Sequence, residues 1–287
     1  MNSCSGKSSI ERTTRQDSSM IKAAVLGKPI AHSLSPFVHG QIYQKLGVEY
    51  SYERIEHDAL SAPAFISQAL SSGEWSGFSL TMPLKEVAFS LNLLCDRHSL
   101  TAHSVNTLTP GHGFNTDVTG LVRVLEELEI DLEKVVILGS GATARSALLA
   151  LQELNESGKK VGVVDIFRRS NNGDLLLQKA SRLEKRISSL ENFSTERNSR
   201  LIISTLPSTA QSGISLQLQG FSGTLFDISY SPWPSTFAGV VKGPVVSGLS
   251  LLVAQAVDQA AIFTGVNFDR GEMYREVKLS TARELAK

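Results

Sequence analysis

The feature that most constrains the fold is a continuous apolar run that leads directly into a glycine-rich turn. Residues 135–138, Val-Val-Ile-Leu, carry no polar side chain, which is typical of a parallel strand covered by helices on both faces of its sheet. Gly139-Ser140-Gly141 follows, with Ala144 at the third small position of a G-x-G-x-x-G/A pattern,. The sequence therefore predicts a strand, a phosphate-binding turn and a helix N-terminus, the entry to a dinucleotide-binding fold. A purely structural turn between a strand and a helix is the alternative.

Strand and helix patterns alternate along the rest of the chain. The predicted strands cover residues 21–26, 50–56, 78–82, 105–108, 113–115, 160–165, 201–205, 224–228 and 245–246. The predicted helices cover residues 35–46, 60–70, 83–94, 118–128, 145–154, 175–190, 250–263 and 270–285. Ser35 as the capping residue and Pro36 at the first helical position begin the first of these helices. This order predicts an α/β fold with largely parallel sheets.

Composition excludes several classes of function. The 28 Lys and Arg residues balance 28 Asp and Glu residues, so we expect no general nucleic-acid binder. No apolar stretch reaches 18 residues, so no membrane span is expected. The two cysteines, Cys4 and Cys95, have no partners at metal-ligand spacing, so we expect no metal site, no disulfide framework and a cytoplasmic location.

Three side chains after the glycine loop bear on the choice of cofactor. Asp165 is predicted to end the second strand, where a carboxylate binds the adenosine ribose and repels a 2′-phosphate, which favours NAD. Arg168 and Arg169 follow closely, and either could bind a 2′-phosphate, which favours NADP. Two solvated loop arginines are the alternative interpretation.

The first half of the chain places polar residues where predicted strands end. Ser33 and Ser35 offer two hydroxyls that could bind a carboxylate, although Ser35 could equally serve as a helix cap. Lys85 lies in the first turn of a predicted helix, where the macrodipole disfavours a cation, so a functional reason for it is expected. Asn106 ends another strand, and Asp117 begins a helix, where a plain N-cap is the alternative.

These residues belong to stretches that together resemble the sequence pattern of the shikimate dehydrogenase family from residue 21 onward. The pattern G-x-P-I-x-H-S-x-S-P matches residues 27–36, and G-x-N-V-T-x-P-x-K matches residues 77–85 with Ser79 in place of Asn. The remaining stretches are V-N-T at 105–107, N-T-D-x-x-G at 115–120, Y-x-P at 230–232 and G-x-x-M-L-V-x-Q at 248–255, with Leu251 in place of Met.

The resemblance implies a role for each matched residue. It implies that Lys85 and Asp117 form the catalytic pair, and that the substrate carboxylate is held by Ser33, Ser35 and Tyr230. It implies that the ring hydroxyls are bound by Thr81, Asn106 and Gln255. The implied cofactor contacts, together with those inferred above, are Gly139, Ser140, Gly141, Ala142, Thr143, Asp165, Arg168, Arg169, Ile228 and Gly248.

The resemblance also implies a two-lobed protein. We expect an N-terminal α/β substrate domain of residues 21–120, a Rossmann-type dinucleotide-binding domain of residues 121–246, and C-terminal helices, residues 247–287, that return to the first lobe. Residues 1–20 are polar and lack an apolar core, so we expect a disordered extension.

Departures from the family pattern fall mainly in the cofactor half. An ungapped alignment places Asp165 and Ile166 where the family has the Asn and Arg of an N-R-T stretch, and residues 204–207, Ser-Thr-Leu-Pro, replace N-A-T-S. These changes affect the choice of cofactor, and we expect NADP, with NAD as the alternative. The forms at Ser79 and at 204–207 resemble the actinobacterial branch.

The reaction that the resemblance implies is the reversible reduction of 3-dehydroshikimate to shikimate, a step of chorismate and aromatic amino-acid biosynthesis. An NAD-dependent quinate/shikimate dehydrogenase is the alternative that Asp165 favours. A catalytically silent nucleotide-binding regulator is an alternative from another class, against which the intact Lys85 and Asp117 argue. The expected partner is the small-molecule substrate, with no nucleic acid or membrane, and the expected state is a monomer or homodimer.

Overall fold

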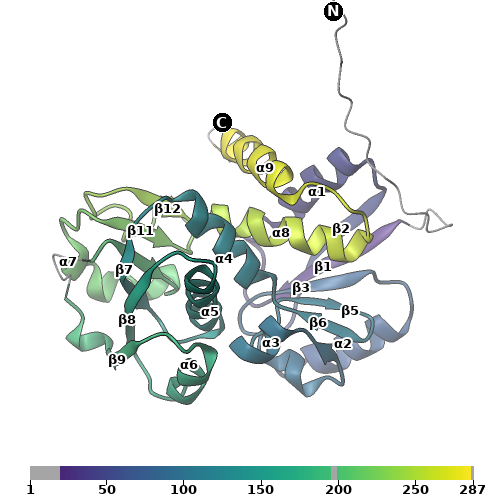
Figure 1. Cartoon of the computed structure of the whole chain (residues 1–287). Helices are drawn as coiled ribbons and strands as arrows, with labels where there is room; N and C mark the ends of the chain where they lie inside the picture. Colours follow the sequence, from purple (N-terminus) through teal and green to yellow (C-terminus); the bar gives the residue numbers. More distant parts are fainter. Residues whose placement is uncertain (1–19, 195–198, 286–287) are drawn as a thin grey trace, which may run out of the picture.

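Two six-stranded sheets build the protein, one in each of two lobes (Figure 1). The computed structural model describes residues 20–194 and 199–285, so the predicted extension lies outside the described residues except for Met20. The α/β fold with two lobes is confirmed. No helix in the described ranges is long and apolar enough to cross a membrane.

The first sheet has the strand order β2-β1-β3-β5-β6-β4 and is mixed rather than largely parallel. Its first three strands are parallel, whereas β5 runs antiparallel to both β3 and β6. Its strands are β1 (Ile21–Gly27), β2 (Tyr50–Glu56), β3 (Gly77–Leu80), β4 (Leu94–Cys95), β5 (Thr107–Thr109) and β6 (His112–Phe114). The helices of this lobe are α1 (Ser35–Leu46), α2 (Ala62–Ser71) and α3 (Arg97–Ala102).

The second sheet has the order β12-β11-β10-β7-β8-β9 and all its pairs are parallel. Its strands are β7 (Leu132–Leu138), β8 (Val161–Arg168), β9 (Lys185–Ser189), β10 (Leu201–Ser204), β11 (Thr224–Asp227) and β12 (Val245–Ser247). Its helices are α5 (Ala142–Glu156), α6 (Asp174–Ala180) and α7 (Ser215–Leu218). The strand order reverses between β7 and β10, and ligands of open α/β sheets bind outside the carboxyl ends of strands at such a switch point.

Two helices, α4 (Thr116–Glu127) and α8 (Leu249–Thr264), connect the lobes, and α9 (Arg270–Leu285) packs against α8 and α1. α8 packs against α1, α4 and α9, and nearly all of its residues are buried. One apolar core cluster runs from β1 through α8 to β7, so the helix forms part of the interior of both lobes. Its buried Asp258 is neutralised by Arg123 and Arg270, at 3.2 and 3.4 Å.

The predicted helix over residues 83–94 is wrong. A single 3-10 turn, η1 (Val87–Ser90), occupies part of this segment. Leu84 and Ala88 are both fully buried, and main-chain bonds of the i to i+3 type tighten the chain between them, as from the Val87 amide to the Leu84 carbonyl. Asp96 then caps the unpredicted α3, accepting from the Ser99 amide at 2.7 Å,.

Candidate active site

Two adjacent cavities lie between the lobes and meet at Lys85. One, of about 510 Å³, extends over the first lobe, and the other, of about 490 Å³, faces the glycine loop. The residues that line both are Thr81, Lys85, Pro207, Ile228, Ser229, Tyr230 and Leu251. The site therefore has two compartments whose contents would touch at their common wall.

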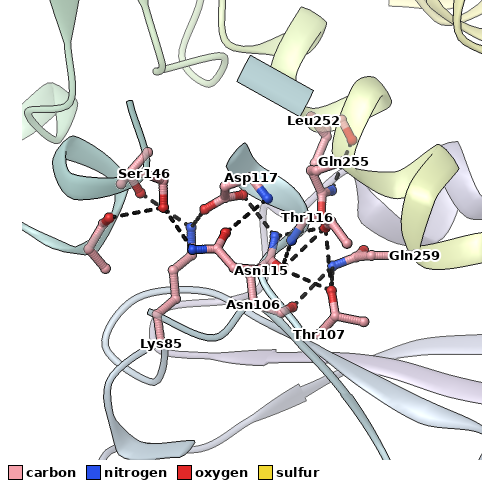
Figure 2. Close-up of polar contacts among 12 residues, drawn as sticks. Lys85, Asn106, Thr107, Asn115, Thr116, Asp117, Ser146, Leu252, Gln255 and Gln259 are labelled. Atoms are coloured by element: carbon pink, nitrogen blue, oxygen red, sulfur yellow. Dashed lines mark hydrogen bonds and ion pairs between the residues drawn. The ribbon is translucent and has the colours of Figure 1, made fainter. Parts of the chain in front are cut away.

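Lys85 and Asp117 form an ion pair at this junction (Figure 2), with Lys85 Nζ 2.5 Å from Asp117 Oδ2. Their side chains are 15 % and 5 % exposed, so the pair is largely screened from water. Asn106 Nδ2 donates to the other carboxylate oxygen, Oδ1, at 2.8 Å. The cap of α4 is Asn115, which accepts from the Asp117 amide. Asp117 is therefore not a helix cap, and its carboxylate is committed to Lys85 and Asn106.

Lys85 also reaches the second lobe. Its Nζ donates to Thr143 Oγ1 at 3.2 Å, and Thr143 lies in the first turn of α5, directly after the glycine loop. An ammonium held by a carboxylate on one side and by the glycine-loop helix on the other can deliver a proton where the two cavities meet, and the amine that results can take one up in the reverse direction.

Ser33, Ser35 and Tyr230 bring their hydroxyls together in the first-lobe cavity. Ser33 Oγ lies 3.2 Å from Ser35 Oγ, and the Tyr230 hydroxyl contacts Ser33, while burial raises the pKa of Tyr230. α1 begins at Ser35 after Leu34, with no side-chain cap bond, so the prediction of Ser35 as the capping residue is wrong. Its hydroxyl instead accepts from Ser33 Oγ and lines the cavity.

Arg54 is a neighbour of this hydroxyl cluster that the sequence analysis missed. Its Nε donates to the Ser33 main-chain carbonyl at 2.7 Å, and its charge favours ionisation of Tyr230. The only signal in the sequence was a cation within the alternating pattern of the second strand, which a solvated face explains equally well.

The remaining predicted substrate residues, Thr81, Asn106 and Gln255, line the same cavity. The Asn106 amide is already occupied by protein, since Nδ2 donates to Thr116 Oγ1 as well as to Asp117. Gln255 Nε2 donates to the Leu252 carbonyl one turn back on α8. Asn106 thus orients Asp117 in addition to lining the cavity.

The glycine loop has the geometry that the sequence predicts. Gly139 has a φ of +117°, and a Cβ there would lie 2.2 Å from Thr205 Oγ1. A Cβ at Gly141, the cap of α5, would meet nothing within 4 Å. Gly141, Ala142 and Thr143 line the second cavity, whereas Gly139 and Ser140 lie outside its lining.

The opposite wall of the second cavity comes from the ends of β10 and β11. Thr205, Leu206 and Pro207 directly follow β10, a position that could have marked them as site residues. Ile228 follows β11, and a Cβ at Gly248 would lie 1.8 Å from the Ile228 carbonyl oxygen. Glycine is therefore required at 248 because the two chain segments touch there.

The prediction that Asp165 ends the second strand is wrong. β8 continues to Arg168, and Asp165 pairs in register with Val136 inside the sheet. Arg186 on the neighbouring β9 binds its carboxylate in a bidentate manner, at 2.6 and 2.8 Å. Asp165 is 6 % exposed, so its carboxylate is not available to a ribose at the strand end.

The two arginines at the end of β8 differ in their freedom. Arg168 makes a bidentate pair with Asp174, the first residue of α6, at 2.9 and 2.8 Å. Arg169 is exposed and has no partner among the residues that the structure describes. Ile166 is fully buried, so the ungapped alignment that gave it the place of the family Arg is also wrong. The residues at the end of β8, where the N-R-T stretch of the family is expected, are Arg168-Arg169-Ser170.

Within residues 20–194 and 199–285, no group of three or more His, Cys, Asp or Glu side chains could hold a metal ion. The residues do fit a dinucleotide: a glycine turn without side chains in the way, the N-terminus of a 15-residue helix, and an unpartnered arginine beside it.

Comparison with known proteins agrees with this geometry. Residues 25–108 match the model of the shikimate dehydrogenase substrate binding domain. The chain is 31 % identical to the shikimate dehydrogenase (NADP(+)) of Leptospira interrogans, over 88 % of this chain and 92 % of that protein.

Solved structures give the same result. Mycobacterium tuberculosis shikimate dehydrogenase superposes with a TM-score of 0.75 at 30 % identity, covering 91 % of this chain and 99 % of the other. Shikimate 5-dehydrogenase of Thermus thermophilus, in complex with shikimate, superposes with a TM-score of 0.70 at 28 % identity, covering 91 % and 99 %. With this agreement in sequence and fold, the chain belongs to the shikimate dehydrogenase family, as its motifs predict.

Proposed function

We propose that this protein catalyses the reversible, NADP-dependent reduction of 3-dehydroshikimate to shikimate. The observation that carries the proposal is the position of the Lys85–Asp117 pair at the junction of the two cavities. One cavity is lined by hydroxyl and amide groups suited to a polyhydroxylated carboxylic acid, and the other by the glycine loop. Relatives of this chain carry the name shikimate dehydrogenase (NADP(+)).

Ser33, Ser35 and Tyr230 are proposed to hold the substrate carboxylate. Their three hydroxyls converge at one end of the first-lobe cavity, and Arg54 adds a positive charge behind them. Hydrogen bonds to an ionised acceptor are about twice as strong as neutral ones, so this cluster would fix one end of the ring and leave the other end facing Lys85.

Lys85 is proposed as the general acid for ketone reduction and, in reverse, as the acceptor of the hydroxyl proton. The cofactor, when bound, supplies the hydride as NADPH in the reduction and accepts it as NADP⁺ in the reverse reaction. Lys85 would deliver a proton from Nζ to the oxygen on which negative charge develops. Asp117 holds Nζ in place from one side and Thr143 from the other, which keeps the donor beside both compartments.

NADP is favoured over NAD by the end of β8. The Asp165 carboxylate, the feature of the sequence that favours NAD, is bound by Arg186 inside the sheet. It therefore does not repel a 2′-phosphate. The end of β8 lies beside the glycine loop, where the Gly139 amide donates to the Phe167 carbonyl. Arg169 is exposed there without a partner in the described part of the chain, and we propose that it binds the 2′-phosphate. Gly141, Ala142 and Thr143 at the N-terminus of α5 would bind the pyrophosphate.

Measurement of kcat/KM for shikimate and for quinate, each with NADP and with NAD, tests this proposal. We expect the highest value with shikimate and NADP. A higher value with quinate and NAD would favour the quinate/shikimate alternative. No change in nicotinamide absorbance with any pair would favour the silent regulator.

In domain terms, we propose that residues 21–120 with 247–287 bind substrate and that residues 121–246 bind the cofactor. The assignment is supported by α8, which carries Gln255 and lies against α1. We further propose a cytoplasmic location, since Cys95 is a free cysteine,. A monomer or a homodimer would suffice for the mechanism, because every group named in it belongs to one chain.

A further inference from the structure

A second amide on α8, Gln259, lies behind the wall of the substrate cavity and has no role in the mechanism above. It is 1 % exposed and lies one helical turn beyond Gln255. Its Nε2 donates to the Asn106 main-chain carbonyl and to Thr107 Oγ1, both at 3.0 Å (Figure 2). Its Oε1 lies 2.7 Å from Ser79 Oγ. Both N–H groups of the Gln259 amide are therefore bonded to Asn106 and Thr107, the residues through which hydrogen bonds lead to Asp117.

The Asn106 main-chain carbonyl determines which way this amide points, because a carbonyl can only accept. Nε2 of Gln259 must face it, so Oε1 is the acceptor on the other side. Ser79 therefore donates to Oε1 and itself accepts from the Tyr52 hydroxyl at 2.7 Å. The Ser79 that departs from the family pattern is thus part of this arrangement.

His39 completes the set of donors. Its Nε2 lies 3.1 Å from Gln259 Oε1, and its Nδ1 lies 3.1 Å from the Tyr43 hydroxyl. Since Oε1 is an acceptor, Nε2 must carry the proton and Nδ1 must accept from Tyr43. His39 is fully buried, and burial lowers its pKa to about 3, so the imidazole is neutral, as this arrangement requires.

The bonds continue from Gln259 to the ion pair. Thr107 Oγ1 donates to Asn106 Oδ1 at 2.9 Å, and Asn106 Nδ2 donates to Asp117 Oδ1 at 2.8 Å. Asp117 Oδ2 holds Lys85 Nζ. An uninterrupted series of buried, directional hydrogen bonds therefore runs from α8 to the proposed proton donor.

We propose that Gln259 is a positioning residue for the Lys85–Asp117 pair, acting through Thr107 and Asn106, with Ser79 and His39 fixing the orientation of its amide. Buried polar groups that are fully satisfied hold one another in a single arrangement, and a proton donor loses effectiveness when its geometry loosens. The inference rests on the proposed dehydrogenase function, which supplies the role of Lys85.

Gln259→Met tests the proposal, because Met has a similar length without donor or strong acceptor. We expect kcat to fall by about 10- to 100-fold, the range known for residues that orient the ligands of metal sites, while KM for shikimate changes far less. In a Lys85→Ala background the same substitution should lower kcat no further, since both act through one group.

Thr107→Val provides a second variant should Gln259→Met fold poorly, because it removes the middle hydroxyl with little change in shape. We expect this variant also to have a lower kcat while its KM for shikimate changes far less. The matched control is Gln41→Met on α1, a half-buried glutamine that bonds Thr281 on α9; it removes the same kind of bond far from the site and should leave kcat unchanged.

Wild-type kcat in both Gln259→Met and Thr107→Val would overturn the proposal, as would an equal loss of kcat when Lys85 is already alanine. A loss confined to KM would make Gln259 part of the substrate wall and would also overturn it. Absence of shikimate oxidation in the unmodified protein is a different result, which would contradict the proposed function itself.

Discussion

Lys85 connects the two lobes of the site through one nitrogen atom. Its Nζ contacts Asp117 and Thr143, and its side chain lines both cavities. We expect Lys85→Ala to lower kcat by about 10²- to 10⁴-fold with a smaller effect on KM, because acid–base assistance acts mainly in the transition state. Steady-state kinetics measures this, with Lys45→Ala, an exposed ion-pair lysine on α1, as the control. Unchanged kcat would remove Lys85 from the mechanism.

His39 makes the stability of the protein depend on pH in a defined direction. Its pKa is about 3 in the folded protein, against an ordinary value of 6.5, so between these values the unfolded chain binds a proton that the folded chain does not. The free energy of unfolding should therefore be fully retained above pH 6.5 and decrease as pH falls, with a contribution of up to about 1.4 kcal/mol per pH unit.

Urea unfolding of the wild type and of His39→Gln between pH 4 and 7 gives the slope of the free energy of unfolding against pH for each protein. The difference between the two slopes measures the His39 contribution, which corresponds to about one proton at most. Carboxylates that titrate in this range are common to both proteins and cancel. Equal slopes would show that His39 binds its proton in the folded protein as well.

At the scale of the element, the proposed choice of cofactor depends on the end of β8. Arg169→Ala should raise KM for NADP by roughly 10-fold or more, the effect of losing a hydrogen bond to a charged group, and leave KM for NAD nearly unchanged. Arg168 is held by Asp174, so Arg168→Ala is expected to act mainly on the stability of α6. Equal changes in KM for the two cofactors in Arg169→Ala would contradict the 2′-phosphate role.

The errors in predicting β8 and β9 have one cause. Residues 175–190 show helical spacing, but α6 ends at Ala180 and β9 occupies residues 185–189. A pattern that predicts helix over β9 also hides the residue that pairs with Asp165 across the sheet. The partner, Arg186, lies 21 residues away. Pairing across a sheet is a tertiary fact that local periodicity does not contain.

The sequence predicts the residues that line the site better than it predicts the buried residues that hold them in place. The motifs predict several of the residues that line the two cavities, Lys85 and Ser33 among them, because these lie at strand and helix ends where a short local pattern fixes their surroundings. Gln259 and His39 appeared only as polar residues on apolar helices. Their partners lie on other elements, up to 220 residues away in the chain, and a single sequence does not show such pairs.

At the scale of the whole molecule, a buried arginine joins the two lobes in addition to α4 and α8. Arg145 belongs to α5 of the second lobe and is 1 % exposed. Its Nε donates to the Ala102 carbonyl at 2.7 Å and its Nη2 to the His103 carbonyl at 2.9 Å, both in the first lobe. Nη2 also pairs with Glu86, next to Lys85, at 2.5 Å. The arginine thus fixes the cofactor helix against the segment that carries the proposed proton donor.

Replacement of Arg145 should lower the free energy of unfolding far more than replacement of an exposed arginine that also links the two lobes. Arg145→Met leaves buried carbonyl groups without donors, so we expect the free energy of unfolding to fall by about 2–4 kcal/mol. Arg97 on α3 also pairs with α5, through Glu153, but its side chain is 70 % exposed, and Arg97→Met should cost about 0–1 kcal/mol. Urea unfolding followed by circular dichroism compares the two variants. Similar losses in both would show that burial does not set the strength of the link between the lobes.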